Sequence, residues 1–135
     1  MADRAVLLAG ATGLVGSRVL AHWLAAEDGP VVIAPVRRAL AISHPRLRAL
    51  PGHWDADSVA GALAGAGVPL VAYACCLGTT IRQAGSREAF LAVDRDLVLA
   101  LGEIARSLGA RQALMVSSVG ASAQSGNFYL RVKGE

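Results

Sequence analysis

The sequence predicts an α/β domain built on a parallel, doubly wound sheet. Short apolar runs alternate with longer stretches of helical periodicity along the chain, and this order is typical of βαβ units. Hydrophobic residues make up 54% of the chain and charged residues 17%, as expected when strands are covered on both faces. A glycine-rich segment, residues 10–16 (GATGLVG), joins the first apolar run to the first helical stretch.

The predicted strands are short apolar runs. The first, AVLLA, ends at a glycine, and the second, VVIAPV, is rich in β-branched residues, which favour strands. The third is the weakest, because residues 40–50 show no clear period and only their end suggests a strand. We expect strands at residues 5–9, 31–36, 47–50, 70–76 and 113–116, the last of them buried.

The predicted helices begin and end at typical boundary residues. Asp57 is a candidate cap of a short helix, Ser86 can cap a long one, and Gly109 ends it. No repeat or internal linker divides the chain, so residues 1–135 form one domain. We expect helices at residues 14–26, 57–63 and 86–108, and the start of another at residue 127.

The glycine segment predicts a phosphate-binding turn. Gly10 can adopt the backbone angles of a tight turn, Gly13 lets a pyrophosphate approach the backbone, and Gly16 permits close packing of the helix. The N–H groups at the start of the following helix attract anions. The alternative is a tight strand-to-helix turn that binds no ligand, but the position between strand and helix favours a dinucleotide.

The end of the second strand bears on the choice of cofactor. An acidic residue that would bind the ribose 2′-hydroxyl of NAD is absent between Asp28 and Asp55. Arg37 and Arg38 stand there instead, and guanidinium groups attract a 2′-phosphate. We therefore expect NADP as cofactor, with NADPH preferred over NADH. The alternative is a solvated arginine pair on a loop.

Near the end of the sequence, Tyr129 and Lys133 form a Tyr-x-x-x-Lys pair. This spacing puts both side chains on one face of a helix, and Lys133 is the only lysine in a chain whose other basic residues are arginines. An ammonium group can bind ribose hydroxyls and lower the pKa of a nearby phenol. Tyr129 could then exchange a proton with a substrate carbonyl or alcohol, and Lys133 is a candidate in both catalysis and cofactor binding.

Two serines follow the last predicted strand. Ser117 and Ser118 stand at its carboxyl end, where ligands bind in such sheets. Either hydroxyl could hold the substrate oxygen, with Ser118 slightly preferred, and an ordinary strand-ending turn is the alternative.

Together with these residues, several short motifs resemble the short-chain dehydrogenase/reductase superfamily. The resemblance covers nearly the whole chain. Within the superfamily, the chain looks most like an atypical branch that includes bacterial nucleoside-diphosphate-sugar epimerase-like proteins. The motifs are residues 75–80 (CCLGTT), 84–85 (AG), 93–96 (VDRD), 117–118 (SS) and 127–135 (NFYLRVKGE).

The resemblance implies a Rossmann fold with strand order 3-2-1-4-5 and NADP(H) binding. Members of the superfamily continue with another strand and a substrate-binding region, so we expect the C-terminal part of the domain to be missing from residues 1–135. Tyr129 and Lys133 would carry the superfamily's catalytic roles. Residues that the resemblance places at the pyrophosphate are Gly10, Thr12, Gly13, Leu14 and Val15, and those beside the cofactor are Leu77, Gly78 and Thr79.

Composition argues against several other kinds of site. The net charge is +3 and the 13 basic residues are scattered, so nucleic-acid binding is not expected. Cys75 and Cys76 are adjacent, which provides neither a disulfide framework nor a zinc site, and no metal site is expected. No apolar stretch reaches the roughly 18 residues of a membrane helix. Residues 1–10 lack the basic start and long apolar segment typical of a secretory signal, so we do not expect one. We expect a cytoplasmic protein with a small-molecule substrate, and allow a homodimer.

We therefore expect an NADP(H)-dependent oxidoreductase or epimerase-like enzyme. It would move hydride to or from a carbonyl, an alcohol or a sugar-nucleotide-like substrate. The alternative is a non-catalytic NADP(H)-binding regulatory or interaction protein on the same fold, because a fold alone does not fix a function.

Overall fold

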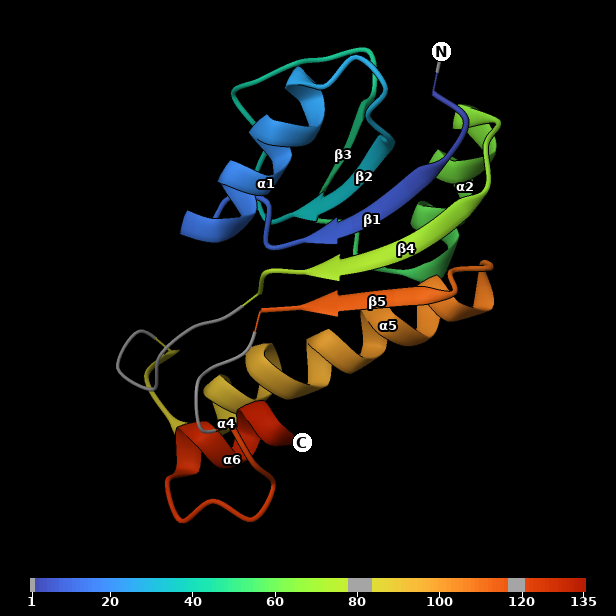
Figure 1. Cartoon of the computed structure of the whole chain (residues 1–135). Coiled ribbons are helices and arrows are strands. Elements are labelled where there is room, and N and C mark those ends of the chain that lie inside the picture. Colours follow the sequence, from blue (N-terminus) through green and yellow to red (C-terminus); the bar gives the residue numbers. More distant parts are fainter. Residues whose placement is uncertain (1, 78–83, 117–120) are drawn as a thin grey trace.

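A parallel sheet forms the centre of the molecule (Figure 1). The computed structural model describes residues 2–77, 84–116 and 121–135. In this part of the chain the sheet has five strands in the order β3-β2-β1-β4-β5, which confirms the predicted order. The strands are β1 (Ala5–Ala9), β2 (Val31–Val36), β3 (Leu47–Pro51), β4 (Leu70–Cys75) and β5 (Gln112–Met115).

The helices pack on both faces of this sheet, so the predicted doubly wound α/β architecture is confirmed. Leu20 of α1 joins the core on one face, while Val59 of α2 and Leu101 of α5 join the core on the other. Successive strand residues alternate between these two cores, as Leu7 and Leu8 do. The helical segments are α1 (Leu14–Ala25), α2 (Ala56–Ala66), α4 (Arg87–Leu91), η1 (Ala92–Leu97), α5 (Val98–Ser107) and α6 (Phe128–Gly134).

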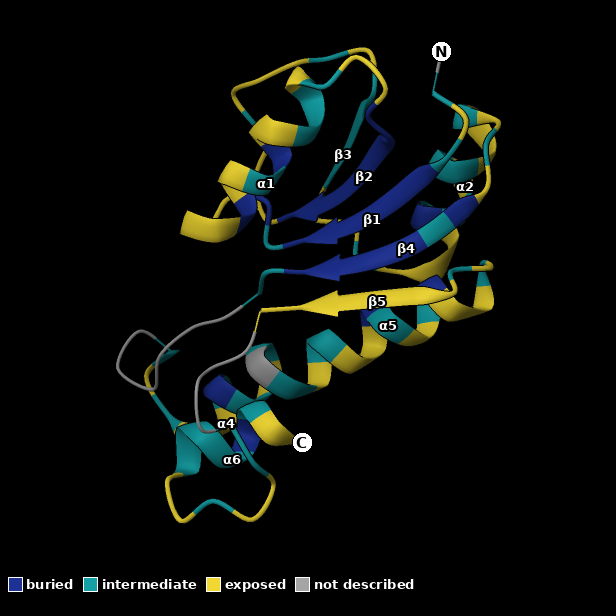
Figure 2. Ribbon diagram, viewed as in Figure 1, coloured by how far each residue is buried: buried dark blue, intermediate teal, exposed yellow. Residues whose placement is uncertain are grey.

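The strand β5 differs from the prediction, which had it buried. All four of its residues are exposed, while β1 and β2 are buried throughout (Figure 2). The reason is that β5 is the edge strand of the described sheet and pairs there with β4 alone. Between α1 and β5 this leaves an apolar hollow of about 730 Å³, here called the α1–β5 groove. Its lining includes Leu14, Val15, Leu114, Met115 and Val116, all of them exposed.

Two helix boundaries also differ from the prediction. The cap of α2 is Asp55 and not Asp57, because the Asp55 carboxylate accepts hydrogen bonds from the backbone N–H and the hydroxyl of Ser58, at 2.8 and 2.9 Å. The predicted long helix does begin after Ser86, whose hydroxyl accepts from the N–H of Ala89. Its middle is the π-helix η1, however, which separates α4 from α5.

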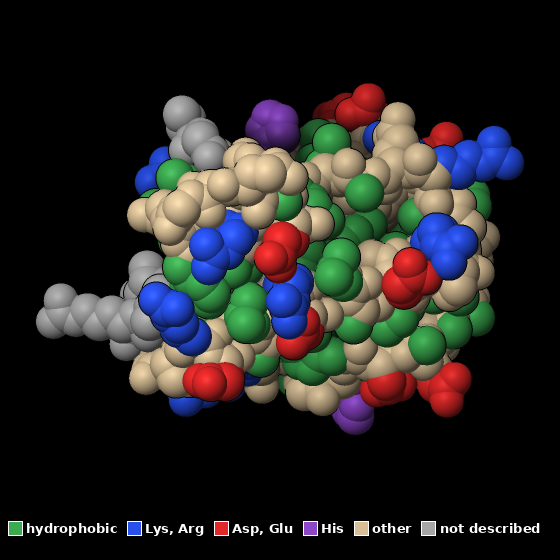
Figure 3. Space-filling view, turned by 90° about the horizontal axis from the view of Figure 1, so that it is seen from below, with side chains coloured by type: hydrophobic (Ala, Val, Ile, Leu, Met, Phe, Trp, Pro, Cys, Tyr) green, Lys and Arg blue, Asp and Glu red, His purple; other side chains and the backbone are tan. Residues whose placement is uncertain are grey.

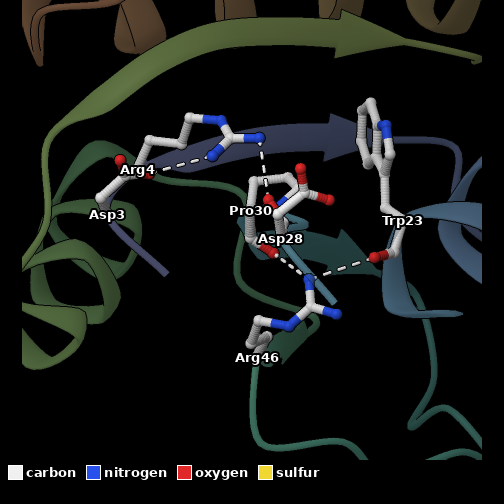
Figure 4. Close-up of polar contacts among 6 residues, drawn as sticks. All are labelled: Asp3, Arg4, Trp23, Asp28, Pro30 and Arg46. Carbon is white, nitrogen blue, oxygen red and sulfur yellow. Dashed lines mark hydrogen bonds and ion pairs between the residues drawn. The ribbon is translucent and has the colours of Figure 1, made fainter. Parts of the chain in front are cut away.

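A single arginine joins the end of α1 to the second and third strands. The guanidinium of Arg46 donates hydrogen bonds to the carbonyl oxygens of Trp23 and Pro30, both at 3.1 Å (Figure 4). It also donates to those of Leu24 and Ala26, at 3.0 and 2.5 Å. The last carbonyls of a helix have no partner within the helix. Arg46 therefore supplies the partners that the end of α1 needs, from a residue at the start of β3.

The face that carries the end of the chain shows no large patch of one charge. Basic and acidic side chains alternate there among hydrophobic ones (Figure 3). Arg95 pairs with Asp96 at 2.9 Å and with Glu135 at 3.4 Å, and Arg106 pairs with Glu103 at 2.8 Å. Among the described residues, no helix has both the length and the apolar character needed to cross a membrane.

Candidate cofactor-binding site

A pocket of about 420 Å³ opens at the carboxyl ends of the strands, and we call it the edge pocket. The strand ends around it are tied together by backbone hydrogen bonds, including Cys76 N–H to Ala9 O at 2.8 Å and Gly52 N–H to Val36 O at 2.7 Å. Ligands of open α/β sheets bind at this edge. The lining residues are Gly10, Ala11, Thr12, Gly13, Pro35, Val36, Arg37, Arg38, Trp54, Cys76, Leu77 and Val93.

Two glycines of the loop are required by the protein's own backbone. Gly10 has a φ of +83°, and a Cβ there would lie 2.5 Å from the carbonyl carbon of Cys76. A Cβ at Gly16 would lie 1.8 Å from the carbonyl oxygen of Gly10. The close packing predicted for Gly16 is therefore present, and its partner is the loop itself.

Gly13 is different, because the nearest atom to an added Cβ is the Gly10 carbonyl oxygen at an ordinary 3.5 Å. Gly13 lines the edge pocket and is the N-cap of α1, which has no side-chain cap and no acidic residue in its first turn. Free N–H groups and the positive end of a helix dipole suit an anion. The loop therefore has the space and the donors that a pyrophosphate needs.

The side chains of Leu14 and Val15, two residues predicted at the pyrophosphate, lie outside the edge pocket. Their side chains are 76% and 44% exposed and line the α1–β5 groove rather than the edge pocket. Their backbone N–H groups stand at the start of α1, which is compatible with the predicted contact to phosphate.

The predicted 2′-phosphate residues lie in the same pocket as the glycine loop. Arg37 and Arg38 are exposed and line the edge pocket just past β2. Within the described residues neither forms a salt bridge, and none of the pocket's lining residues is acidic. The pocket also includes lining residues to which the sequence assigned no role in cofactor binding, among them Trp54, which follows β3, and Val93 of η1.

Tyr129 and Lys133 both lie on α6 and face each other, as their spacing predicts. The Lys133 nitrogen lies 5.6 Å from the centre of the Tyr129 ring. The helix is held by its cap, Asn127, whose side chain accepts from the N–H of Leu130, and by Phe90, whose ring lies 5.6 Å from that of Tyr129.

A smaller cavity of about 130 Å³ lies next to Lys133 and shares one lining residue with the edge pocket, while Tyr129 lines neither of the two. Lys133 lines it together with Arg95 and Glu135, and Leu77 lines both cavities. The segment η1 also borders both, through Val93 in the edge pocket and Arg95 in the smaller cavity. A ligand extended along the strand ends could therefore reach from the glycine loop towards Lys133.

Four predicted site residues lie outside the described part of the chain. They are Gly78, Thr79, Ser117 and Ser118. The described residues next to them, Leu77 and Val116, line the smaller cavity.

The thiol of Cys76 is not activated in this site. Burial raises its pKa, and the neighbouring Cys75 raises it further. A raised thiol pKa keeps the neutral form at neutral pH, and the neutral thiol is a poor nucleophile. Cys76 therefore serves the edge pocket as a small apolar side chain.

A sequence profile described as NAD(P)H-binding matches residues 10–133. The match begins at Gly10 of the loop and ends at Lys133 of α6, so it covers the edge pocket and the Tyr–Lys pair together. The chain belongs to the NAD(P)H-binding family.

Curated proteins with similar sequences include one from a fungus and one from an animal. "Protein FMP52, mitochondrial" of Eremothecium gossypii is 33% identical over 129 residues, which are 96% of this chain and 56% of that protein. "Protein HTATIP2" of Rattus norvegicus is 49% identical over 61 residues, which are 45% of this chain and 25% of that protein. The chain thus spans only about half, or less, of the length of these two relatives.

Solved structures share the fold of this NAD(P)H-binding chain. Uronate dehydrogenase from Agrobacterium tumefaciens has a TM-score of 0.63 at 22% identity, over 90% of this chain and 42% of that one. MoeE5 in complex with UDP-glucose and NAD has a TM-score of 0.70 at 18% identity, over 96% and 45%. A short-chain dehydrogenase from Leptospira borgpetersenii with bound NAD⁺ has a TM-score of 0.71 at 16% identity, over 98% and 61%. The Rossmann-type fold is confirmed.

Proposed function

We propose that this chain is the cofactor-binding part of an NADP(H)-dependent oxidoreductase. The edge pocket carries the proposal, because it combines a glycine cradle at Gly13 with two arginines, and its described lining includes no acidic residue. NADPH, when bound, supplies the hydride for reduction of a carbonyl group. The substrate would be a small molecule with a carbonyl or an alcohol, including one resembling a sugar nucleotide.

The residues of this chain would divide the work along the strand ends. The N–H groups at the start of α1 would hold the pyrophosphate, and Arg37 and Arg38 would hold the 2′-phosphate. Lys133 would bind ribose hydroxyls, and Tyr129 would give a proton to the substrate oxygen or take one from it. Ser117 or Ser118 would hold that oxygen, and Gly78 and Thr79 would run beside the cofactor.

Titration with NADPH and NADH tests the choice of cofactor. We expect tighter binding of NADPH, and we expect Arg37→Ala with Arg38→Ala to weaken it about tenfold or more while NADH affinity changes little, because only NADPH has the 2′-phosphate. Arg111→Ala is the matched control, since Arg111 is exposed and precedes β5 at the opposite edge of the sheet. Equal or tighter binding of NADH by the unaltered protein would refute the preference.

A Tyr129→Phe variant of the full-length protein tests the proposed proton transfer. We expect a fall in kcat of about a hundredfold or more with NADPH affinity retained, because only the proton donor is removed. Carbonyl reduction that survives the change would show that Tyr129 is not the donor. Tight NADPH binding without any measurable reduction in the unaltered protein would favour the non-catalytic regulator.

We also propose where the protein is located and how it assembles. We propose a cytoplasmic protein that acts on a small molecule and that does not bind nucleic acid or membranes. The fungal relatives are named as mitochondrial proteins, so cell fractionation is the direct test. Sedimentation of the purified protein would show whether the homodimer forms.

A further inference from the structure

Trp54 occupies a part of the edge pocket that the proposed roles leave unused. It lines the pocket beside Pro35, Val36, Arg37 and Arg38, and it is half-buried against the core under α2 and α5. Of the described residues that line this pocket, Trp54 is the one aromatic side chain.

Trp54 lies in a short connection between β3 and α2 that is fixed at both ends. Gly52, with a φ of +72°, turns the chain directly after the strand and donates its N–H to the carbonyl of Val36 at the end of β2. One residue beyond Trp54, Asp55 begins α2 as its cap. The backbone of Trp54 is therefore held between a turn that is bonded to β2 and a capped helix.

Asp55, which also follows β3, is committed elsewhere. Both oxygens of its carboxylate accept hydrogen bonds from Ser58, and the hydrogen bond from the Ser58 N–H is the main reason that the pKa of Asp55 is lowered. Its carboxylate is therefore occupied in capping α2, and the side chain with a free flat surface at this end of the pocket is Trp54.

The order of the strands decides which end of a dinucleotide would meet Trp54. The glycine loop follows β1, the two arginines follow β2, and Trp54 follows β3, and these three strands are neighbours in that sequence. With the pyrophosphate at the loop and the 2′-phosphate at the arginines, the group that extends beyond the phosphorylated ribose is the adenine ring. Aromatic side chains bind a base by stacking on its face.

We propose that Trp54 is the side chain against which the adenine ring of NADP(H) packs. The inference rests on the proposed function, because it needs the dinucleotide to lie in the edge pocket. The chain offers an internal control, since it has two tryptophans and Trp23 lines the α1–β5 groove instead.

Fluorescence titration of two single-tryptophan proteins with NADP⁺ tests the proposal. Stacking on adenine quenches indole emission, and NADP⁺ lacks the reduced ring that absorbs this emission. We expect NADP⁺ to quench Trp23→Phe, which keeps Trp54, and to leave Trp54→Phe, which keeps Trp23, nearly unchanged. Trp54→Ala should also bind NADP⁺ and adenosine 2′,5′-bisphosphate about tenfold more weakly, because stacking on the base is lost.

The outcomes separate this proposal from the one on which it rests. Equal quenching of the two single-tryptophan proteins would overturn the role of Trp54, as would a folded Trp54→Ala protein with unaltered affinity for adenosine 2′,5′-bisphosphate. If Trp54→Ala does not fold, the comparison of the two phenylalanine variants decides. Absence of NADP⁺ binding by the unaltered protein, measured by calorimetry, would overturn the proposed function and this inference with it.

Discussion

The three glycines of the loop meet three different demands. Gly10 and Gly16 are needed because other backbone atoms of the protein lie where a side chain would be. Gly13 has ordinary space within the protein and borders the edge pocket. We therefore expect its missing side chain to matter for a ligand, whereas the other two matter for the fold.

This contrast predicts opposite effects of alanine at two of these positions. We expect Gly13→Ala to weaken NADP⁺ binding about tenfold or more, because a methyl group enters the phosphate cradle, while the free energy of unfolding changes by less than about 1 kcal/mol. We expect Gly16→Ala to lower the free energy of unfolding by about 2–3 kcal/mol, because the loop must move. Calorimetric titration and urea unfolding measure the two quantities.

Gly61 provides the control for both variants. It lies on the exposed side of α2 and an added Cβ meets nothing within 4 Å. Gly61→Ala should therefore stabilise the protein by about 0.5–1 kcal/mol, because alanine favours a helix. A Gly13→Ala protein that is destabilised as strongly as Gly16→Ala would contradict the division of roles.

At the scale of single residues, the sequence is enough to predict a role when that role depends on the type of residue and its immediate neighbours in the chain. The glycines and the arginine pair are recognisable because the loop and the end of β2 are local features. Trp54 is not recognisable in the same way, since its place in the pocket depends on the pairing of β2 with β3 and on the turn at Gly52. A tryptophan after a weak strand gives no signal until that pairing is known.

At the scale of the elements, Arg46 holds together parts that are distant in sequence. Its guanidinium satisfies four carbonyl groups near the end of α1 and the start of β2. A Cβ at Gly29 would lie 2.2 Å from one of its nitrogens. The guanidinium therefore fills the space that this glycine leaves open.

We expect Arg46→Met to lower the free energy of unfolding by about 2–3 kcal/mol, because charged hydrogen bonds to several carbonyls are lost. Arg46→Lys should recover less than half of this loss, since one ammonium group cannot reach carbonyls on both sides as the planar guanidinium does. Urea unfolding followed by circular dichroism gives the values.

Arg48→Met is the matched control for Arg46. Arg48 makes only local contacts, to the carbonyl oxygens of Pro45 and Leu47, and its loss should change stability by less than about 0.5 kcal/mol. Equal effects of the two substitutions would show that the hydrogen bonds of Arg46 contribute little.

The elements themselves were predictable where their pattern is local, and less so where it is not. The runs AVLLA and VVIAPV form β1 and β2 at the predicted positions, because a continuous apolar run is typical of a buried parallel strand. β5 has the same kind of apolar sequence and is exposed, since burial depends on what covers a strand. The π-helix η1 has no signature in the helical period that surrounds it.

On the scale of the whole molecule, the edge pocket exists only in the folded chain. Its lining comes from the ends of β1, β2, β3 and β4 and from η1. A ligand of this pocket must therefore bind the folded state and not the unfolded one.

We expect NADP⁺ at a hundred times its dissociation constant to stabilise the fold by about 2.7 kcal/mol. This corresponds to a rise in Tm of roughly 10 °C for a domain of this size. Differential scanning fluorimetry measures it. The control is the Gly13→Ala protein at the same NADP⁺ concentration, whose Tm should rise by about half as much or less, since its dissociation constant is expected to be about tenfold higher or more. An equal rise in the two proteins would mean that the stabilising ligand binds elsewhere.

The topology of the molecule could be predicted because few arrangements satisfy an alternating series of strands and helices. Right-handed crossovers limit the possible orders but leave more than one, such as 2-1-3-4-5. The resemblance to the short-chain dehydrogenases implies the order 3-2-1-4-5, and the structure has it. The sequence does not predict which side chains meet at the strand ends, because this depends on the register of the strands. In the structure, for example, Leu7 is paired with Ile33 and with Tyr73.

The lining of the edge pocket comes from several separate loops, each of which follows a different strand. The proposed phosphate cradle follows β1, the arginine pair follows β2, and Trp54 follows β3. These connections share the sheet as a scaffold, but each is a separate loop. A laboratory or a lineage could therefore exchange the residues after β2, and with them the preferred coenzyme, while the cradle after β1 keeps its shape.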